Sequence, residues 1–198
     1  MKKIIALAAI AAACSTSAFA QVSNFEGFSA ATNLTHSNTS VSNSNDSLSD
    51  KTVGANLQAA YGFALDTSTV LTVGASYALK DTKTGDYTND DGSTGVLKLK
   101  NQISYYVEPG FLLNASTLVY GKISYDTASL NAIQADGTTK TNIKGMGYGV
   151  GARTMLDKNL FLQAEVKHTT FGSEALPGDT DKIKTKNTVV SFGVGYKF

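Results

Sequence analysis

The sequence predicts an all-β protein: an eight-stranded antiparallel up-and-down β-barrel, preceded by a cleavable helical signal peptide. Three observations lead to this fold. The chain begins with a positively charged and then apolar leader, eight later segments alternate between apolar and small or polar residues, and the last segment ends on an aromatic residue. Successive side chains of a strand point to opposite faces, so such alternation indicates strands with two different environments.

The leader has the three parts of a secretory signal peptide. Residues 1–3 carry two lysines, residues 4–13 are apolar, and Ala18-Phe19-Ala20 is a small-x-small cleavage site. The apolar run is too short to cross a bilayer as a helix. We therefore expect cleavage after Ala20, with Ala18 and Ala20 forming the recognised site. This divides the chain into a signal peptide, residues 1–20, and a barrel domain, residues 21–198.

Cys14 leaves an alternative for the leader. Three alanines precede it, so a degenerate lipoprotein site with lipid on Cys14 is conceivable, but the Leu expected three residues before that cysteine is missing. Cleavage after Ala20 removes this one cysteine, and the mature chain then has no disulfide and no cysteine chemistry.

Composition excludes several classes of function. Loss of Lys2 and Lys3 with the leader changes the balance from 17 basic and 16 acidic residues to 15 and 16, a formal net charge of −1. A chain this close to neutrality has no electrostatic footprint for nucleic acid. The sequence also lacks a Gly-rich phosphate loop, a metal-spaced Cys/His pair and a Gly-x-Ser-x-Gly elbow, so we expect no cofactor and no catalytic or metal site.

The terminal segment, residues 187–198, shows which environments the two faces occupy. One face is large and apolar, and it comprises Thr188, Val190, Phe192, Val194, Tyr196 and Phe198. The other face is small with a polar end, and it comprises Val189, Ser191, Gly193, Gly195 and Lys197. The bulky face suits lipid and the small face suits a cramped barrel interior, which makes the predicted barrel a transmembrane one.

Seven further segments repeat this alternation. We expect strands at residues 24–34, 53–65, 70–80, 96–108, 117–127, 144–156 and 160–171. Long polar stretches, expected to be loops, follow the first, third, fifth and seventh strands: 35–52, 81–95, 128–143 and 172–186. Short turns are expected at 66–69, 109–116 and 157–159. In outer-membrane barrels long loops face outside and short turns face the periplasm, so both termini are expected in the periplasm.

The chain resembles the opacity-protein-like outer-membrane barrel family, and it is similar to the small outer-membrane protein A and X type barrels. The resemblance covers the mature chain and rests on the leader, the eight strands and four short runs: Glu108-Pro109-Gly110, Leu118-Val119-Tyr120-Gly121-Lys122, Ala164-Glu165-Val166-Lys167-His168-Thr169-Thr170-Phe171-Gly172 and Gly195-Tyr196-Lys197-Phe198. It implies a bacterial outer-membrane barrel with surface loops, in a family linked to adhesion, envelope integrity and surface antigenicity. In that family the terminal strand, here with Tyr196 and Phe198, is read by the barrel-assembly machinery.

The interior of the barrel is expected to be charged. The inward-facing charges by this alternation are Lys98, Lys100, Glu108, Lys122, Asp126, Arg153, Glu165 and Lys167. An eight-stranded barrel is just wide enough for side chains to fill, and charges inside lipid must be paired or hydrated. We expect Glu108, Lys122, Arg153 and Glu165 to form an ion-pair network, with Arg153 holding both carboxylates. A plug of paired charges is favoured over a narrow gated pore, since a wide channel needs more strands.

Two weaker candidates are interpreted structurally. His168 resembles the catalytic His of outer-membrane lipid A deacylases, but Thr170 and Phe171 stand where that motif has Ser and Asn. Residues 86–92 are rich in the oxygen ligands that Ca²⁺ prefers, but they lack EF-hand spacing and a distal Glu, which favours a solvated turn.

Three functions therefore stay open. The leading one is a non-enzymatic surface barrel for adhesion, surface interaction or envelope integrity; a narrow porin-like channel is second, and a lipid A-modifying enzyme is third. We expect a monomer that contacts outer-membrane lipid, lipopolysaccharide, the barrel-assembly machinery and a host or matrix ligand, and that binds no nucleic acid.

Overall fold

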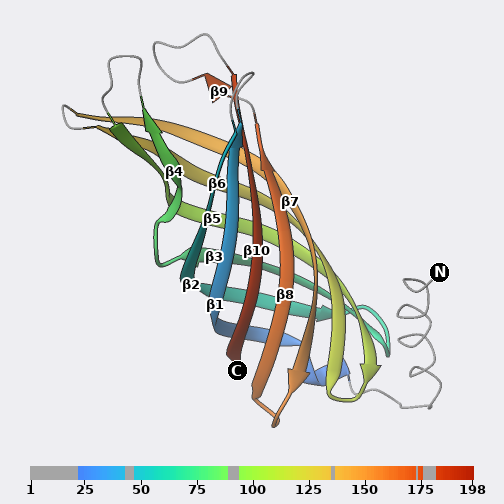
Figure 1. Ribbon diagram of the computed structural model, residues 1–198. Helices are drawn as coiled ribbons and strands as arrows, with labels where there is room; N and C mark the ends of the chain where they lie inside the picture. Colours follow the sequence, from blue (N-terminus) through green and yellow to red (C-terminus); the bar gives the residue numbers. More distant parts are fainter. Residues whose placement is uncertain (1–21, 43–46, 89–93, 135–136, 173, 176–181) are drawn as a thin grey trace, which may run out of the picture.

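The structure is a computed structural model that describes residues 22–42, 47–88, 94–134, 137–172, 174–175 and 182–198. It is a closed barrel of strongly tilted antiparallel strands (Figure 1). The signal peptide, with Cys14, Ala18 and Ala20, lies outside the described residues. Within the described segments, no helix is both long enough and apolar enough to cross a membrane.

The described elements are one short 3₁₀ turn and ten strands. They are η1 (Val22–Asn24), β1 (Gly27–Ser42), β2 (Ser47–Ala64), β3 (Thr69–Ala78), β4 (Thr82–Thr88), β5 (Thr94–Asn114), β6 (Thr117–Gln134), β7 (Gly137–Met155), β8 (Leu160–Phe171), β9 (Glu174–Ala175) and β10 (Lys182–Lys197).

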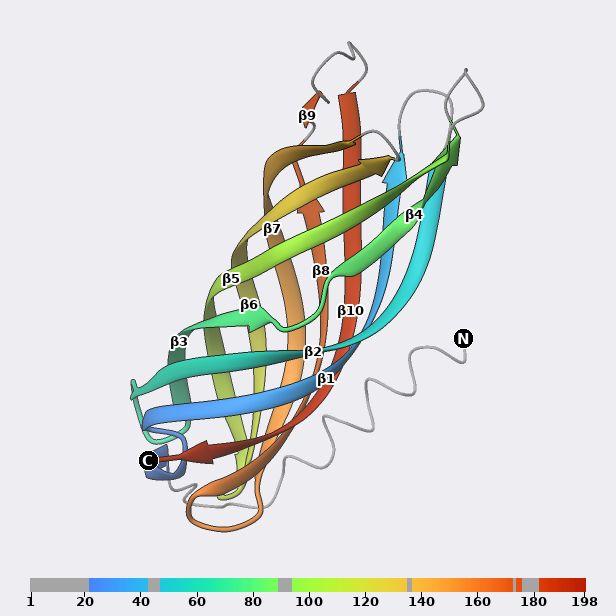
Figure 2. The same ribbon diagram turned by 90° about the vertical axis from the view of Figure 1, so that its left-hand side faces the viewer.

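Eight of these strands form the cylinder, which confirms the predicted fold class. Their order is β1-β2-β3-β5-β6-β7-β8-β10, and β1 pairs with β10 to close the ring. β4 pairs with the upper part of β5, where β3 has ended (Figure 2), and β9 pairs only with β10. The short turns, η1 and the C-terminal Phe198 lie at one end of the barrel, which we call the terminal end. The opposite end, beyond Ser42 and Ser47, is the loop end.

The strands run much further toward the loop end than the alternation predicted. β5 has 21 residues and β7 has 19, whereas a strand tilted across a bilayer needs about 9 to 11. Most of the stretches expected to be loops (35–52, 81–95 and 128–143) are therefore paired strand, with 14 register pairs between β1 and β10 that reach Ser42 and Lys184. The extensions were predicted to be loops because they are rich in Ser, Thr and Asn. Backbone pairing between strands, however, does not require an apolar face.

A bulge in β5 reverses the inward face of its loop-end half. Asn101 has a positive φ of 50°, and the pairing with β6 shifts register between Lys100 and Ile103. Such a bulge adds a residue to one strand and changes which side chains point inward. The expectation that Lys98 and Lys100 face the lumen is therefore wrong. Leu97 and Leu99 are buried instead.

Two other boundaries differ from the prediction. Residues 109–112, expected to begin a turn, continue β5 in regular pairing with β3 or β6. The turn falls at residues 115–116, where Asn114 Oδ1 accepts hydrogen bonds from the backbone N–H (2.9 Å) and the hydroxyl (3.1 Å) of Ser116. Residues 22–24, two of which precede the expected first strand, form the 3₁₀ turn η1.

At the turn between β2 and β3, Asp66 Oδ1 accepts bonds from the backbone N–H of Ser68 (2.7 Å) and of Thr69 (2.9 Å). These bonds, first that from Ser68, hold the pKa of Asp66 below its usual value. This turn forms as predicted.

The outer wall is an apolar belt. Large apolar side chains on all eight cylinder strands are exposed, among them Leu34, Val53, Leu57, Tyr61, Val73, Tyr77, Tyr105, Ile123, Tyr148, Val150, Val166, Phe192 and Tyr196. Monomeric soluble proteins rarely expose so large a continuous apolar surface, whereas a membrane-spanning barrel requires one. The outward face predicted for the terminal strand is confirmed, with Phe192 57% and Phe198 68% exposed.

Candidate functional site: a filled lumen

The middle of the lumen holds four charged side chains, which come from four adjacent strands. Glu108 on β5 forms ion pairs with Lys122 on β6 (3.0 Å) and with Arg153 on β7 (3.4 Å). Lys122 also pairs with Glu165 on β8 at 2.5 Å. Glu108, Lys122 and Arg153 are all at least 94% buried. Two acids and two bases in contact make a neutral cluster, which lowers the cost of removing each charge from water.

Neutral polar side chains connect this cluster to the opposite wall. Arg153 Nε donates to Gln163 Oε1 (3.2 Å), and Gln163 Nε2 donates in turn to Asn33 on β1 (2.7 Å) and Gln58 on β2 (2.9 Å). Tyr120 donates its hydroxyl proton to Glu165 (3.1 Å). The network therefore crosses the whole lumen from β5 to β2. A chain of satisfied partners of this kind holds a buried polar core in one arrangement.

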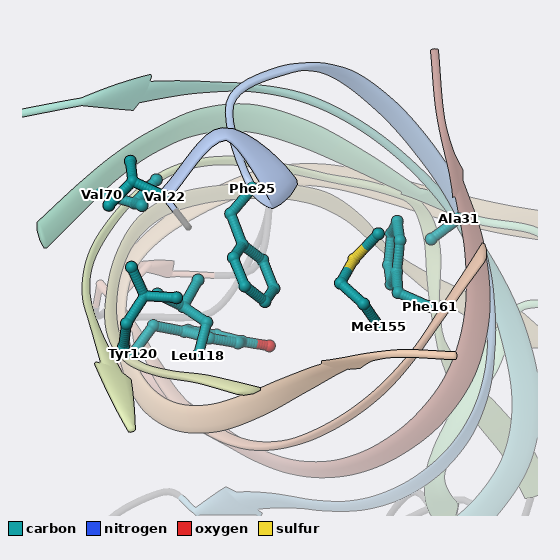
Figure 3. Close-up of a cluster of buried hydrophobic side chains, with 9 residues drawn as sticks. Val22, Phe25, Ala31, Val70, Leu118, Tyr120, Met155 and Phe161 are labelled. Atoms are coloured by element: carbon teal, nitrogen blue, oxygen red, sulfur yellow. The ribbon is translucent and has the colours of Figure 1, made fainter. Parts of the chain in front are cut away.

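An apolar layer closes the lumen below this network, at the terminal end. Figure 3 shows Phe25, which follows η1, inserted among side chains of the surrounding strands. The layer comprises Val22, Phe25, Ala31, Val70, Leu112, Leu118, Tyr120, Met155 and Phe161. Asn24 anchors the segment by donating to the carbonyl of Ala115 at 2.8 Å. The chain before β1 thus acts as a lid on the barrel mouth.

The close approach of the lid to β2 requires a glycine at position 62, and this leads to a first prediction. A Cβ at position 62 would lie 2.1 Å from the carbonyl oxygen of Phe25, a main-chain atom that can retreat only if residues 22–26 move. We expect Gly62→Ala to destabilise the barrel by about 1 to 3 kcal/mol and to accelerate hydrogen exchange at the Phe25 amide. That amide now donates to the Val22 carbonyl at 2.9 Å.

Gly121→Ala is the matched control, because a Cβ there meets no atom within 4 Å. Unchanged exchange at Phe25 in Gly62→Ala would show that the lid does not depend on this close approach.

Above the network, toward the loop end, the lumen contains a small polar cavity of about 80 Å³. Lys167 and Asp126 pair across it at 2.6 Å, and Asp126 also accepts bonds from Ser124 (2.7 Å) and Thr169 (3.2 Å). The volume suits a few water molecules rather than a continuous channel.

A second apolar layer lies above the cavity, where the strands extend toward the loop end. It comprises Leu97, Leu99, Ala128, Leu130, Ala132, Ile143 and Phe171. Leu99 is fully buried, and its register partner across the ladder is Leu130. The β5 bulge is what brings both leucines of β5 to this inner face. In the described part of the lumen, a polar core is thus enclosed between two apolar layers.

The four residues predicted for the lumen network come together, but not with the predicted partners. Arg153 is paired in register with Gln163, while Glu165 lies opposite Gly151. The expectation that Arg153 holds two carboxylates is wrong, because among the described residues its ion pair is with Glu108 alone. Lys122 takes the bridging position instead. Counting along the hairpin from its turn would have given this register, since antiparallel partners are fixed once the turn is known.

Several lumen residues were not singled out from the sequence. Asn33, Gln58 and Gln163 fell on predicted inner faces, and their uncharged amides gave no reason to expect a network. Val22 and Phe25 had only one signal, an apolar pair in a polar stretch next to the expected cleavage site. Nothing in periodicity assigns such a pair to the interior.

The other sequence candidates are placed as follows. His168 lies on the outer wall, where Nδ1 is 2.8 Å from the Thr188 hydroxyl and the ring lies 5.5 Å from that of Tyr148. The stretch 86–92 lies largely outside the described residues. Among those that are described, no group of three or more His, Cys, Asp or Glu side chains is arranged to hold a metal ion.

The chain end is fixed against β1. The Phe198 amide donates to the Phe28 carbonyl at 2.9 Å, and the two rings lie 5.4 Å apart. Tyr196 packs edge-on against Phe198 with the ring centroids 5.1 Å apart. Three outward aromatic rings therefore mark the seam where the barrel closes.

Comparison with solved structures gives the same fold. The attachment invasion locus protein Ail of Yersinia pestis, in complex with the heparin analogue sucrose octasulfate, is 20% identical, with a TM-score of 0.55 over 87% of this chain and 99% of that one. Neisserial surface protein A is 17% identical, with a TM-score of 0.60 over 87% and 98%. OprG from Pseudomonas aeruginosa is 14% identical, with a TM-score of 0.57 over 92% and 99%.

No curated protein matches the chain. The model of one family, the outer membrane protein beta-barrel domain, matches residues 6–198. With a closed eight-stranded ring, an apolar outer wall and a match over nearly its whole length, the chain belongs to the outer membrane protein beta-barrel family of the bacterial outer membrane.

Proposed function

We propose that this protein is a closed, non-enzymatic surface barrel whose loop end faces outside the cell and binds a partner, in adhesion, surface interaction or envelope integrity. The observation that carries the proposal is the filled lumen: ion pairs of Glu108 and Lys122 between two apolar layers leave no continuous path for solutes through the part of the lumen that the structure describes. The strands, however, continue well past the apolar belt. Strand extensions and loops beyond the membrane, together with a filled interior, favour a function at the loop end.

We further propose that both termini lie in the periplasm, that the barrel-assembly machinery reads the terminal strand and that the barrel is a monomer. The orientation rests on the lengths of the connections and is tested by labelling. The proposed cleavage after Ala20 removes Cys14, so the mature chain can carry single introduced cysteines. Exposed positions are Thr139 at the loop end and Lys158 at the terminal end. A membrane-impermeant maleimide should label Thr139→Cys but not Lys158→Cys on intact cells. The reverse pattern would overturn the orientation.

The partner-binding role is tested by shortening one hairpin. Ala128 and Ile143 are register partners on β6 and β7, so residues 129–142 can be replaced by Asn-Gly, which favours a tight hairpin turn. Cells that carry the shortened protein should bind less to immobilised heparin or matrix protein than cells that carry the full chain. Heparin is the first ligand to test because Ail, a protein of the same fold, is solved with a heparin analogue. Equal binding, with a folded barrel in both strains, would remove this hairpin from the function.

A narrow channel is the second candidate, favoured only by the polar cavity beside Lys167 and Asp126. Planar bilayer recordings separate the two proposals. The closed barrel should show no discrete openings, in wild type or in Gly62→Ala, because the charged network still blocks the lumen when the lid moves. Reproducible single-channel steps in wild type would favour the channel. Lipid A modification is not favoured, because the described neighbours of His168 include no carboxylate to orient it.

A further inference from the structure

The wall of the barrel carries a groove between β2 and β4. The register of β2 and β3 ends at Asn56 and Ala78, with one further backbone bond from the Leu79 amide to the Ala55 carbonyl (2.8 Å), and β4 then pairs with β5. The two sides are then joined by side-chain contacts, such as that of Lys80 Nζ with the Val53 carbonyl (3.0 Å). The groove has a volume of about 730 Å³ and is lined by Asp50, Lys51, Thr52, Val53, Leu79, Lys80, Asp81, Lys83 and Lys98.

The groove is positively charged. Four lysines and two aspartates line it, a formal excess of two positive charges, and Lys100 stands beside it in an ion pair with Asp81 (3.2 Å). Lys83 and Lys98 are register partners on β4 and β5, on the face opposite to buried Thr82 and Leu99. Lys83 lies 3.9 Å from Asp50, so both aspartates of the groove are in ion pairs with lysines. The other three lysines of the groove are Lys51, Lys80 and Lys98, and an anion bound there would be attracted to their ammonium groups.

The position of the groove relative to the apolar belt indicates the environment of that anion. Val53 and Leu79, on its lower side, are 62% and 53% exposed and belong to the apolar belt. Lys51 precedes Val53 by two residues on the same outward face of β2. Cationic and apolar side chains thus meet at the loop-end border of the belt. At such a border, lysines attract the headgroups of anionic lipids while the belt contacts acyl chains.

We propose that this groove is a binding site for a phosphorylated glycolipid of the outer leaflet. The ammonium groups of Lys51 and Lys98 hold its phosphate, and an acyl chain lies along Val53 and Leu79. The assignment to the outer leaflet rests on the proposed orientation, whereas the chemistry of the groove does not. A soluble polyanion would need no apolar side to its site, and the exposed Val53 and Leu79 therefore favour a lipid.

The test is native mass spectrometry of the protein in detergent, titrated with bis-phosphorylated Kdo2-lipid A or with its dephosphorylated form. Wild type should retain one phosphorylated lipid. The double variant Lys51→Gln/Lys98→Gln should bind it about 30-fold more weakly, because each lysine near such a headgroup contributes about 1 kcal/mol. The dephosphorylated lipid should bind wild type and variant equally weakly.

Lys140→Gln/Lys144→Gln is the matched control, since it removes two exposed lysines from β7 at the same end of the barrel and should leave lipid binding unchanged. A shift in gel mobility on heating verifies that each variant is folded. Equal retention of the two lipids, or no loss in Lys51→Gln/Lys98→Gln, would overturn the proposal. Lysine-dependent binding of sucrose octasulfate without binding of lipid A would overturn it too, in favour of a soluble polyanion. None of these outcomes depends on the labelling result, so the orientation and the site fail separately.

Discussion

Replacing Glu108 with glutamine is expected to lower the free energy of unfolding by about 3 to 5 kcal/mol. Glu108 is 1% exposed and is the acid that contacts both Lys122 and Arg153. Without its charge, Lys122 keeps Glu165, but Arg153 is left with neutral Gln163 and two aromatic rings. The loss follows from an unpaired buried cation, and urea unfolding in lipid vesicles measures it.

Glu26→Gln is the control for Glu108→Gln, because it makes the same chemical change at an exposed site near the terminal end and should cost less than about 0.5 kcal/mol. The double variant Glu108→Gln/Arg153→Gln restores charge balance. It should therefore be less destabilised than the sum of the single variants by about 0.5 to 3 kcal/mol. Small and additive losses would instead describe a hydrated lumen, in which exposed pairs contribute about 1 kcal/mol or less.

Deletion of Phe198 is expected to reduce the folded barrel in the outer membrane to a small fraction of the wild-type amount while export continues. Phe198 bonds to the Phe28 backbone and packs against the rings of Phe28 and Tyr196, so its loss removes the last contacts of the closing seam. It also removes the terminal aromatic residue proposed as the assembly signal. Quantitative immunoblots of unboiled outer-membrane fractions measure the folded amount, and the cleaved leader reports export.

Phe28→Ala separates these two causes. It removes the ring contact with Phe198 but leaves the chain end intact, so assembly should be close to normal if the terminal residue is read as a signal. Phe63→Ala controls for loss of an exposed aromatic ring elsewhere on the belt. Wild-type levels of folded protein in the Phe198 deletion would show that this residue is not needed for assembly.

Alternation was sufficient to predict the membrane-spanning part of the fold. Along β6, even-numbered residues from Leu118 to Ala132 are all buried, and along β10 the bulky residues are exposed as the sequence indicates. The rule depends only on strand geometry and on lipid outside the ring, so it holds wherever pairing is regular. It fails at Asn101, because one extra residue reverses every face beyond it and nothing in the local composition marks the insertion.

The lumen site was partly predictable for the same reason. Inward faces identified Glu108, Lys122, Arg153 and Glu165, but the choice of partners depends on register and on the height of each residue along tilted strands. Lys122 rather than Arg153 bridges the two acids, a result that sequence spacing alone does not contain. The lid formed by residues 22–25 precedes the first strand, where no periodic pattern applies.

The closing seam also constrains when this barrel can form. Its 14 register pairs join β1 to β10, and buried Thr39 donates to Asn187, 148 residues away, at 3.1 Å. Contacts between such distant parts of a chain appear late and slowly, because the entropy of closing a long loop must be lost before they form. The first strand therefore has no permanent neighbour on one side until the last strand has arrived. Until then, a chaperone or an assembly factor would have to shield that edge from pairing with other chains.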